Sequence, residues 1–327
     1  MKLTISQAHD LAHRAMTSCG HSETEAAVIA DHLLDCELRG LSYGGLARAL
    51  SIIERKRQIP QPPRPITIIR ETPVSASIDG GDQVGYLVAQ RATEIALSKA
   101  RTTGIAAVGA NQTWYTGMFS YYLEQITAAG LVGVIAGSGP HVVAPHGGTE
   151  SRFGTNPIAF GFPTAGAPLI WDIGTSSITL AEVMLHERLG HPLSGGLAYS
   201  ASGSPTLDPS EALAGAFTVW GGHRGSGLAL TVQLLGMLTG AAAAPVGLSD
   251  CGFFLSVWDP ALFTDPDDFK RRAAAYADSI RTTRPLDSTE PVRVPFERSS
   301  AHRDAQIAQG DIEVQETVYD KLTAVLV

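Results

Sequence analysis

Cysteine is scarce in this sequence of 327 residues, which contains only Cys19, Cys36 and Cys251. The count is odd, no two cysteines show CxxC spacing, and the first residues do not form the apolar stretch of a signal peptide. Disulfide frameworks and thiolate zinc sites depend on paired or closely spaced cysteines. The sequence therefore argues against both, and it favours a reducing, cytoplasmic compartment.

Charge and long apolar runs are limited as well. Charged residues make up 17% of the chain, and 24 Lys and Arg against 32 Asp and Glu give a formal net charge of -8. A negative protein repels a polyphosphate backbone, so nucleic acid is not an expected partner. The sequence lacks the long apolar run that a membrane-spanning helix requires, which argues against a membrane partner. With 44% hydrophobic residues, it predicts a globular protein with a substantial core.

Two well-known motifs are missing. No GxGxxG pattern follows a predicted strand, so the fingerprint of an ordinary Rossmann domain is absent. His186, Glu187 and His191 resemble the HExxH motif of metalloproteases, but the second histidine comes five positions after the first instead of four. Five positions turn a helix by about 500 degrees, which places the two rings on different faces. We therefore expect no metal site there.

The pattern of apolar residues divides the chain into three parts. The first part, residues 1–72, is predicted to be a helical region. Its proline-rich segment Ile59–Ile66 cannot be helical and is the predicted boundary segment. Residues 73–245 alternate between short β-branched runs and helical runs, which is typical of an α/β layer and predicts the domain that binds cofactor and substrate. Residues 246–327 predict a strand and helices that pack back on the core.

Several individual elements can be predicted within these parts. Ser22 and Glu25 have the spacing of a capping box, and the apolar stripe Ala26, Ile29, Leu33 and Cys36 follows them. We predict further helices near residues 83–100, 117–129, 178–189, 225–238, 266–282 and 312–325, and a strand at Phe253–Trp258.

Glycine-flanked polar clusters are the most informative feature of the sequence. Each alone is what any turn uses. In their order, they resemble the type 2 malate/L-lactate dehydrogenase family, and the motifs are most similar to those of the Δ1-piperideine-2-carboxylate and Δ1-pyrroline-2-carboxylate reductases. The resemblance extends from Glu37 to Arg298. Its main stretches are Pro145–Gly148, Phe153–Pro163, Trp171–Ser177 and Trp220–Gly225.

The resemblance implies a fold, an assembly and a cofactor. The expected fold class is α/β, a non-Rossmann malate/L-lactate dehydrogenase-like fold with a large mixed sheet and a helical N-terminal region. Relatives form homodimers and bind NADPH or NADH, and both are expected here. By similarity, the stretch along the nicotinamide consists of Asp172, Ile173, Gly174, Thr175 and Ser176. By the same similarity, His223 and Arg224 reach the phosphates or ribose, and the segment that closes over the cofactor includes Pro295 and Glu297.

The sequence departs from the family where substrate chemistry takes place. In the first family motif, Tyr43 and Gly44 stand where relatives have serine and a proton-transferring histidine. In the second motif, one extra residue leaves either Trp114 or Tyr115 at the histidine position. Because oxidation of an alcohol needs a base that titrates near neutral pH, the loss of both histidines argues against lactate or malate dehydrogenation. An iminium nitrogen arrives already protonated, so reduction of a C=N bond is easier to reconcile with this sequence.

These departures define the candidate catalytic residues and functions. Arg48 is expected to hold the substrate carboxylate, Tyr43 or Tyr115 could donate a proton, and His146 either faces the substrate or caps a turn. The leading hypothesis is an NAD(P)H-dependent reductase of a small cyclic 2-imino carboxylate, which yields the L-amino acid. The alternatives are a 2-oxo acid or 2-hydroxy acid oxidoreductase and a catalytically silent relative that binds the cofactor.

Overall fold

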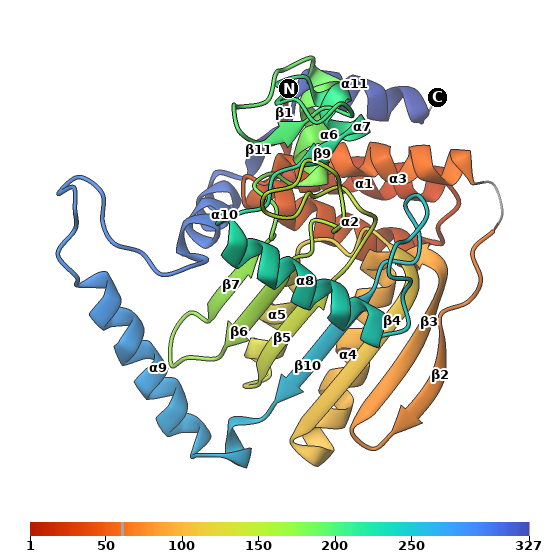
Figure 1. Ribbon diagram of the computed structural model, residues 1–327. Coiled ribbons are helices and arrows are strands. Elements are labelled where there is room, and N and C mark those ends of the chain that lie inside the picture. The colour runs from red at the N-terminus through yellow and green to blue at the C-terminus, as the bar shows by residue number, and fades with distance from the viewer. Residues whose placement is uncertain (60–61, 327) are drawn as a thin grey trace.

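The structure is a computed structural model that describes residues 1–59 and 62–326. Its centre is a seven-stranded mixed sheet (Figure 1). Of the described strands in this sheet, β3 and β4 pair parallel, and the other neighbours pair antiparallel. The spatial order is β2 (Thr67–Thr72), β3 (Ser75–Val84), β4 (Ile105–Trp114), β10 (Phe253–Trp258), β5 (Val132–Gly137), β6 (Ile158–Phe162) and β7 (Leu169–Ile173).

Helices cover both faces of this sheet. The crossover helix α4 (Gly85–Thr103) and helix α5 (Phe119–Ala128) pack on one face, and α8 (His223–Leu238) packs against β5 and β10 on the other (Figure 1). Because side chains alternate along a strand, Ile135 joins the core under α4 and α5, while Ala136 packs in the cluster under α8. The predicted α/β class with a large mixed sheet is confirmed.

An N-terminal helical layer lies beside one end of the sheet (Figure 1). It consists of α1 (Ile5–Ser18), α2 (Glu23–Leu38) and α3 (Leu46–Gln58), against which α11 (Glu316–Val325) packs. The predicted capping box of α2 is present, because the Glu25 N–H donates to Ser22 Oγ and the Ser22 N–H donates to the Glu25 carboxylate. The predicted apolar stripe of α2 is buried.

The last helix differs from the prediction. Residues Asp311–Glu313 form strand β11, which pairs antiparallel with β1 (Lys2–Thr4), so the helix predicted from residue 312 begins at Glu316. Helix α10 (Glu297–Gln309) was not predicted at all. None of its side chains is fully buried, so its sequence has no apolar stripe that would reveal it. The other predicted helices occur within a few residues of their expected bounds.

A side lobe, which residues 138–157 before β6 and residues 174–222 after β7 form, lies against the helical layer. It has its own small apolar core, which includes Val143, Ile178, Val183 and Phe217. The Arg188 guanidinium forms an ion pair with Glu54 of α3 and thereby ties the lobe to the helical layer. The lobe contains α6 (Leu180–Leu189), β8 (Ala198–Tyr199), α7 (Pro209–Ala214) and β9 (Ala216–Phe217).

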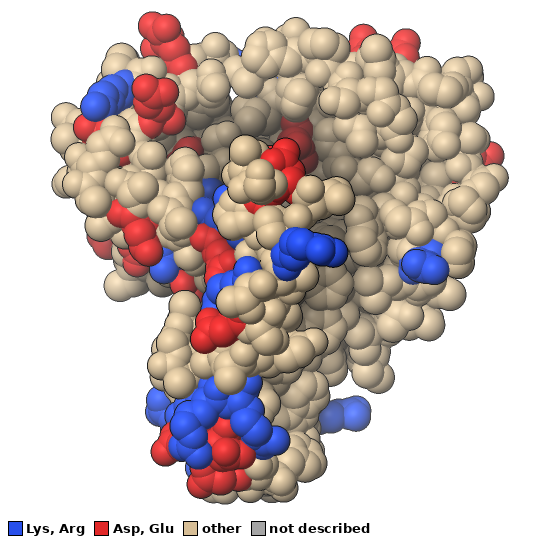
Figure 2. Space-filling view, turned by 90° about the vertical axis from the view of Figure 1, so that its left-hand side faces the viewer, with Lys and Arg blue, Asp and Glu red and all other residues tan. Residues whose placement is uncertain are grey.

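Helix α9 (Pro266–Arg281) projects from the body of the molecule (Figure 1). Its connection to β10 includes the 3-10 helix η2 (Pro260–Leu262). Figure 2 shows basic and acidic side chains gathered at the lower end of this projection. The first turns of α9 contain such groups in ion pairs, including Asp268 with Arg271 and Arg272.

The division of the chain at residues 72 and 245 stays a prediction. Strand β2 comes from the first predicted part and β10 from the last, and both belong to the central sheet. Of the predicted boundary segment Ile59–Ile66, Pro60 and Gln61 lie outside the described residues. Within the described ranges, no helix is both long and apolar enough to cross a membrane.

Candidate active site

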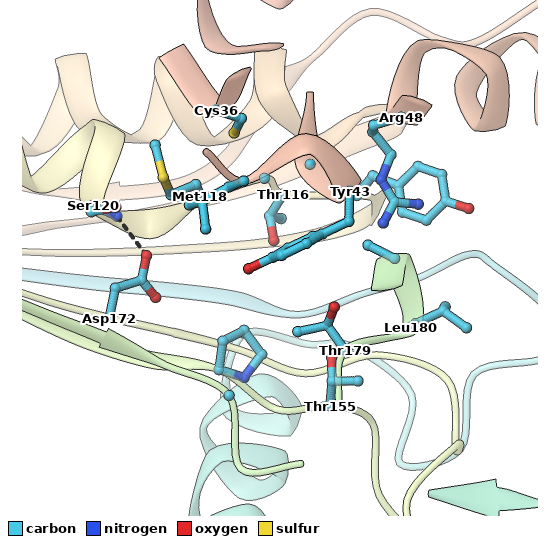
Figure 3. Close-up of a pocket in the computed structure, with 18 of the residues that line it drawn as sticks. Cys36, Tyr43, Arg48, Thr116, Met118, Ser120, Thr155, Asp172, Thr179 and Leu180 are labelled. Carbon is cyan, nitrogen blue, oxygen red and sulfur yellow. Dashed lines mark hydrogen bonds between the residues drawn. The ribbon is translucent and has the colours of Figure 1, made fainter. Parts of the chain in front are cut away.

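A cavity of about 450 Å³ lies where the N-terminal helical layer, the end of the sheet and the side lobe meet (Figure 3). Its wall includes five of the predicted site residues other than glycine: Tyr43, Arg48, Tyr115, Asp172 and Pro295. Gly174 lines it as well. Of the described residues in the wall, none is a histidine. Gly44 and Tyr115, the two positions that the resemblance aligns with histidines of relatives, both line this wall.

Arg48 is a buried cation on α3 whose charge has no counterion among the described residues. Its side chain is enclosed, with 8% of the residue exposed. The guanidinium lies 4.1 Å from the centre of the Tyr115 ring, and Nη1 is 3.9 Å from Met184 Sδ. Neither neighbour neutralises a charge. A buried guanidinium in this state is suited to bind a carboxylate through two parallel hydrogen bonds.

A hydrogen bond to Glu37 fixes the first turn of α3, the turn that carries Arg48. The Leu46 N–H at the first position of α3 donates to Glu37 Oε1 over 2.6 Å. Residue 45 must be glycine, because a Cβ there would overlap the Glu37 carboxylate. Burial raises the pKa of Glu37 to about 7. Glu37 thus caps α3 immediately before Arg48.

The structure places Tyr115, and not Trp114, in the cavity. The Trp114 ring is buried in the core, where its Nε1 donates to the Asp82 carbonyl over 3.0 Å. Tyr115 has a φ of +52°, a left-handed conformation that is uncommon for a bulky residue. This backbone turn at the end of β4 directs the Tyr115 ring under Arg48.

Tyr43 is a neutral phenol that points into the cavity from the 3-10 helix η1 (Ser42–Gly44) (Figure 3). Burial, together with the nearby Glu182 carboxylate, raises its pKa to about 12. At neutral pH this hydroxyl therefore keeps its proton. It can donate a hydrogen bond to a substrate, but it is a poor base.

Asp172 is the carboxyl group of the cavity, and it lies on strand β7. Along this strand Ile170 and Asp172 face α5, whereas Ile173 packs with the cluster under α8. Asp172 Oδ2 accepts the Ser120 N–H at the start of α5 over 2.8 Å (Figure 3). Burial raises the pKa of Asp172 to about 6, and the hydrogen bonds from Ser120 and Phe119 oppose part of that rise. This carboxyl group therefore titrates close to neutral pH.

His146, His223 and Arg224 form a second group outside the cavity wall. His223 and Arg224 are the first residues of α8 and are exposed. The rings of His146 and His223 are 6.2 Å apart, and the His146 N–H donates to Ser226 Oγ over 3.2 Å. His146 thus lies beside the start of α8, with its ring next to that of His223, and it is not among the residues of the cavity wall.

The remaining predicted residues shape loops. The Thr175 hydroxyl donates to the Thr155 carbonyl over 3.1 Å, and the Ser176 hydroxyl donates to the Ile178 carbonyl over 2.6 Å. Glu297 binds the Arg281 guanidinium and accepts the Val294 N–H, which fixes the segment that contains Pro295. These three polar side chains hold the loops beside the cavity through bonds within the protein.

Sequence reasoning missed one buried histidine that supports the cavity. His32 Nε2 accepts the Met118 N–H over 2.8 Å. Burial lowers the pKa of His32 to about 3, and Arg39 adds to the effect, so the ring stays neutral and its nitrogen stays available as an acceptor. Gly117 is required beside it, because it has a φ of +75° and a Cβ there would lie 2.6 Å from His32 Nε2. His32 therefore positions Met118 in the cavity wall.

Other wall residues were not predicted as site residues, although Cys36 belongs to the predicted stripe of α2, and Thr155 and Asn156 belong to the family-like stretch Phe153–Pro163. They include Cys36, Leu41, Thr116, Met118, Thr155, Asn156 and Leu180. The histidines His186 and His191 lie outside the cavity wall, with ring centres 6.3 Å apart. Over the described part of the chain, no group of three or more potential metal ligands is found.

Comparison with known proteins agrees with this arrangement. The family model described as malate/L-lactate dehydrogenase matches residues 3–323. The L-sulfolactate dehydrogenase of Methanothermobacter thermautotrophicus is 29% identical over 99% of this chain and 96% of its own length. The Δ1-pyrroline-2-carboxylate reductase 2 of Burkholderia multivorans is 31% identical over 99% and 97%.

A solved structure extends the likeness to the whole fold. The crystal structure of a dehydrogenase from Sinorhizobium meliloti superposes with a TM-score of 0.92 at 30% identity, and the match covers 100% of this chain and 98% of that one. The predicted non-Rossmann fold is thereby confirmed. The chain belongs to the malate/L-lactate dehydrogenase family, and it is an oxidoreductase of a family that uses NAD(P)H.

Proposed function

We propose that this enzyme is an NAD(P)H-dependent reductase of a small cyclic 2-imino carboxylate, such as Δ1-piperideine-2-carboxylate or Δ1-pyrroline-2-carboxylate, and that it forms the L-amino acid. One observation carries the proposal. The cavity offers a single enclosed guanidinium, Arg48, without a counterion among the described residues, and its described wall has no histidine. This arrangement suits a substrate that needs its carboxylate bound but needs no imidazole.

The charges of the cavity favour a monocarboxylate over a doubly charged acid. Besides Arg48, the described wall contains one further arginine, Arg298, which is exposed on α10. The carboxyl group that lines the same cavity, Asp172, repels a second anion whenever it is ionised. Malate and sulfolactate each carry two acidic groups. A second group of that kind lacks an enclosed partner here, and an unpaired buried charge is costly.

The chemistry of C=N reduction matches the available residues. A bound nicotinamide cofactor supplies the hydride. Arg48 holds the carboxylate, and the π electrons of the C=N bond move to a nitrogen that already carries a proton, so a neutral amine forms without proton transfer from the protein. The Tyr43 phenol and Asp172 orient the substrate through hydrogen bonds. Arg48 stacks on Tyr115, which limits the directions from which a carboxylate can approach.

The protein offers a surface that fits such a cofactor. Gly139 and Gly174 line the cavity without side chains, so a flat ring can approach the backbone closely. The first backbone N–H groups of α8 have no side-chain cap, and Arg224 lies in that first turn. A helix N-terminus with an arginine beside it binds phosphate groups well. We propose that this turn binds the phosphates of the cofactor.

Reduction of a 2-oxo acid is the second candidate, and Asp172 favours it. Reduction of C=O leaves an alkoxide that must be protonated, and a carboxyl group with a pKa of about 6 or the neutral Tyr43 phenol could supply that proton. An assay of NADPH and NADH oxidation over cyclic imino acids and open-chain oxo acids separates the two candidates. Faster turnover of a cyclic imine supports the first, and faster turnover of pyruvate or oxaloacetate supports the second.

We also propose that the enzyme is a homodimer that uses the outer side of α8. Residues 225–249 contain no charged side chain. Leu230, Leu234 and Leu238 of this stretch are about half to three-quarters exposed, at 51%, 53% and 74%, on one side of α8. Such a continuous apolar stripe is typical of a surface that packs against another subunit. A second copy offers an equally uncharged surface, and a two-fold axis would bring the two stripes together.

A further inference from the structure

Gly44 lies in the cavity wall, yet its backbone does not require a glycine. It is the last residue of η1, and its φ is outside the left-handed region. A Cβ built there would contact only Cys36, at 3.3 Å from Sγ and 3.7 Å from Cβ. By contrast, a Cβ at the next residue, Gly45, would overlap the Glu37 carboxylate. Residue 44 can therefore carry a side chain if the Cys36 side chain shifts by a few tenths of an ångström, and the absence of one leaves space in the cavity.

Part of the wall near this space is apolar, although Tyr43 and Thr116 lie beside it (Figure 3). Cys36, Leu41, Gly44 and Met118 line it, and we refer to them as the apolar ceiling. Burial raises the pKa of the Cys36 thiol well above its ordinary value, so this sulfur stays uncharged. Met118 is fixed by the hydrogen bond between its N–H and His32. The ceiling thus offers van der Waals contact without a charge, which suits the hydrocarbon part of a ligand.

We infer that Gly44 is a specificity-determining residue: by leaving the apolar ceiling open, it admits a six-membered ring whose carboxylate is bound by Arg48. This inference rests on the proposed function for the nature of the substrate. A longer side chain at residue 44 narrows the cavity beside the ring and leaves the carboxylate site on α3 unchanged. A shorter side chain at residue 118 widens the same ceiling from its other side.

Binding of two planar ring carboxylates tests the inference without turnover. Furan-2-carboxylate has a five-membered ring and benzoate a six-membered ring, and calorimetry with NADPH present gives a Kd for each. Gly44→Val is expected to weaken benzoate binding more than furan-2-carboxylate binding. The ratio of the benzoate Kd to the furan-2-carboxylate Kd should therefore rise about tenfold. Met118→Ala is expected to move the ratio in the opposite direction. Gly195→Val is the matched control, because Gly195 is exposed and a Cβ there meets nothing within 4 Å.

The outcomes separate this inference from the proposed function. A Kd ratio that stays at the parent value in both variants, or that moves in the same direction in both, overturns the role of Gly44. If Gly44→Val does not fold, Met118→Ala decides alone by the direction of its change. Failure of the parent enzyme to reduce any cyclic imine refutes the proposed function instead, while the two Kd values still report on the ceiling.

Discussion

Replacement of Arg48 by methionine separates substrate binding from folding. Methionine keeps much of the length and the packing against Tyr115 but removes the charge. If the guanidinium forms two charged hydrogen bonds to the carboxylate, at about 1.5–3 kcal/mol each, the variant loses about 3–6 kcal/mol of substrate binding. That loss corresponds to a decrease of about 10²- to 10⁴-fold in kcat/KM. The Kd of the cofactor is expected to stay the same.

For the same variant we expect no loss of stability, in contrast to the loss of activity. In the free enzyme the Arg48 charge is enclosed without a counterion among the described residues. Removal of such a charge relieves a desolvation cost, so the Tm of Arg48→Met is expected to equal or exceed that of the parent. Activity and stability should therefore change in different directions, which loss of a structural residue does not produce.

Arg55 provides a matched control on the same helix. It is similarly buried, at 6% exposed, and its guanidinium lies 4.2 Å from the centre of the Trp114 ring. Unlike Arg48, it is paired with Asp82 at 2.6 Å and donates to the Leu248 carbonyl. Arg55→Met should lower Tm, because it leaves Asp82 without its partner. A lower Tm in Arg48→Met with kcat/KM within threefold of the parent would refute the carboxylate-binding role.

Three further predictions concern the cofactor, Asp172 and the assembly. Arg224→Ala should raise the Kd of NADPH roughly ten- to a hundredfold, as expected for loss of about 1.5–3 kcal/mol of charged hydrogen bonding. Fluorescence titration measures this Kd, and an unchanged value would show that Arg224 does not bind the phosphates. The pKa of Asp172 is raised to about 6, so its ionised form destabilises the folded protein above pH 6, and that cost disappears as the pH falls through 6 toward 4. Asp172→Asn should therefore raise Tm at pH 8 but not at pH 4; an equal change at both pH values contradicts the raised pKa. Leu234→Lys places a charge in the exposed stripe of α8 and should convert the dimer into a monomer, as measured by light scattering at micromolar concentration. If the parent and the variant are both dimers, the interface lies elsewhere.

Local sequence signals predicted the elements that have strong periodicity or caps. The capping box at Ser22 and the stripe that ends at Cys36 identified α2, and the alternating runs identified the sheet. Helix α10 was missed because none of its side chains is fully buried. The strand at Asp311–Glu313 was missed because its partner β1 lies at the other end of the chain, a pairing that no local pattern shows.

In the candidate site, too, local sequence patterns identified residues but not their long-range contacts. Sequence motifs singled out Arg48, Tyr43 and Asp172, and the structure brings all three to one cavity. The motifs could not reveal that Asp172 accepts the Ser120 N–H, since that contact joins β7 to the start of α5 across 52 positions. Nor could they show that the His146 ring lies next to that of His223, outside the cavity wall. Long-range packing determines such contacts.

We propose that the cavity, which contains Arg48 and no histidine among its described wall residues, serves reduction of a C=N bond. The most direct measurement is kcat/KM for Δ1-piperideine-2-carboxylate and for pyruvate, determined with NADPH in the parent enzyme and in Tyr43→Phe. We predict that the imine is preferred, and that its kcat/KM falls by less than the factor of about a hundred typical of a lost general acid. Faster reduction of pyruvate in the parent, or loss of imine turnover in Tyr43→Phe with the Kd of NADPH unchanged, would contradict the claim.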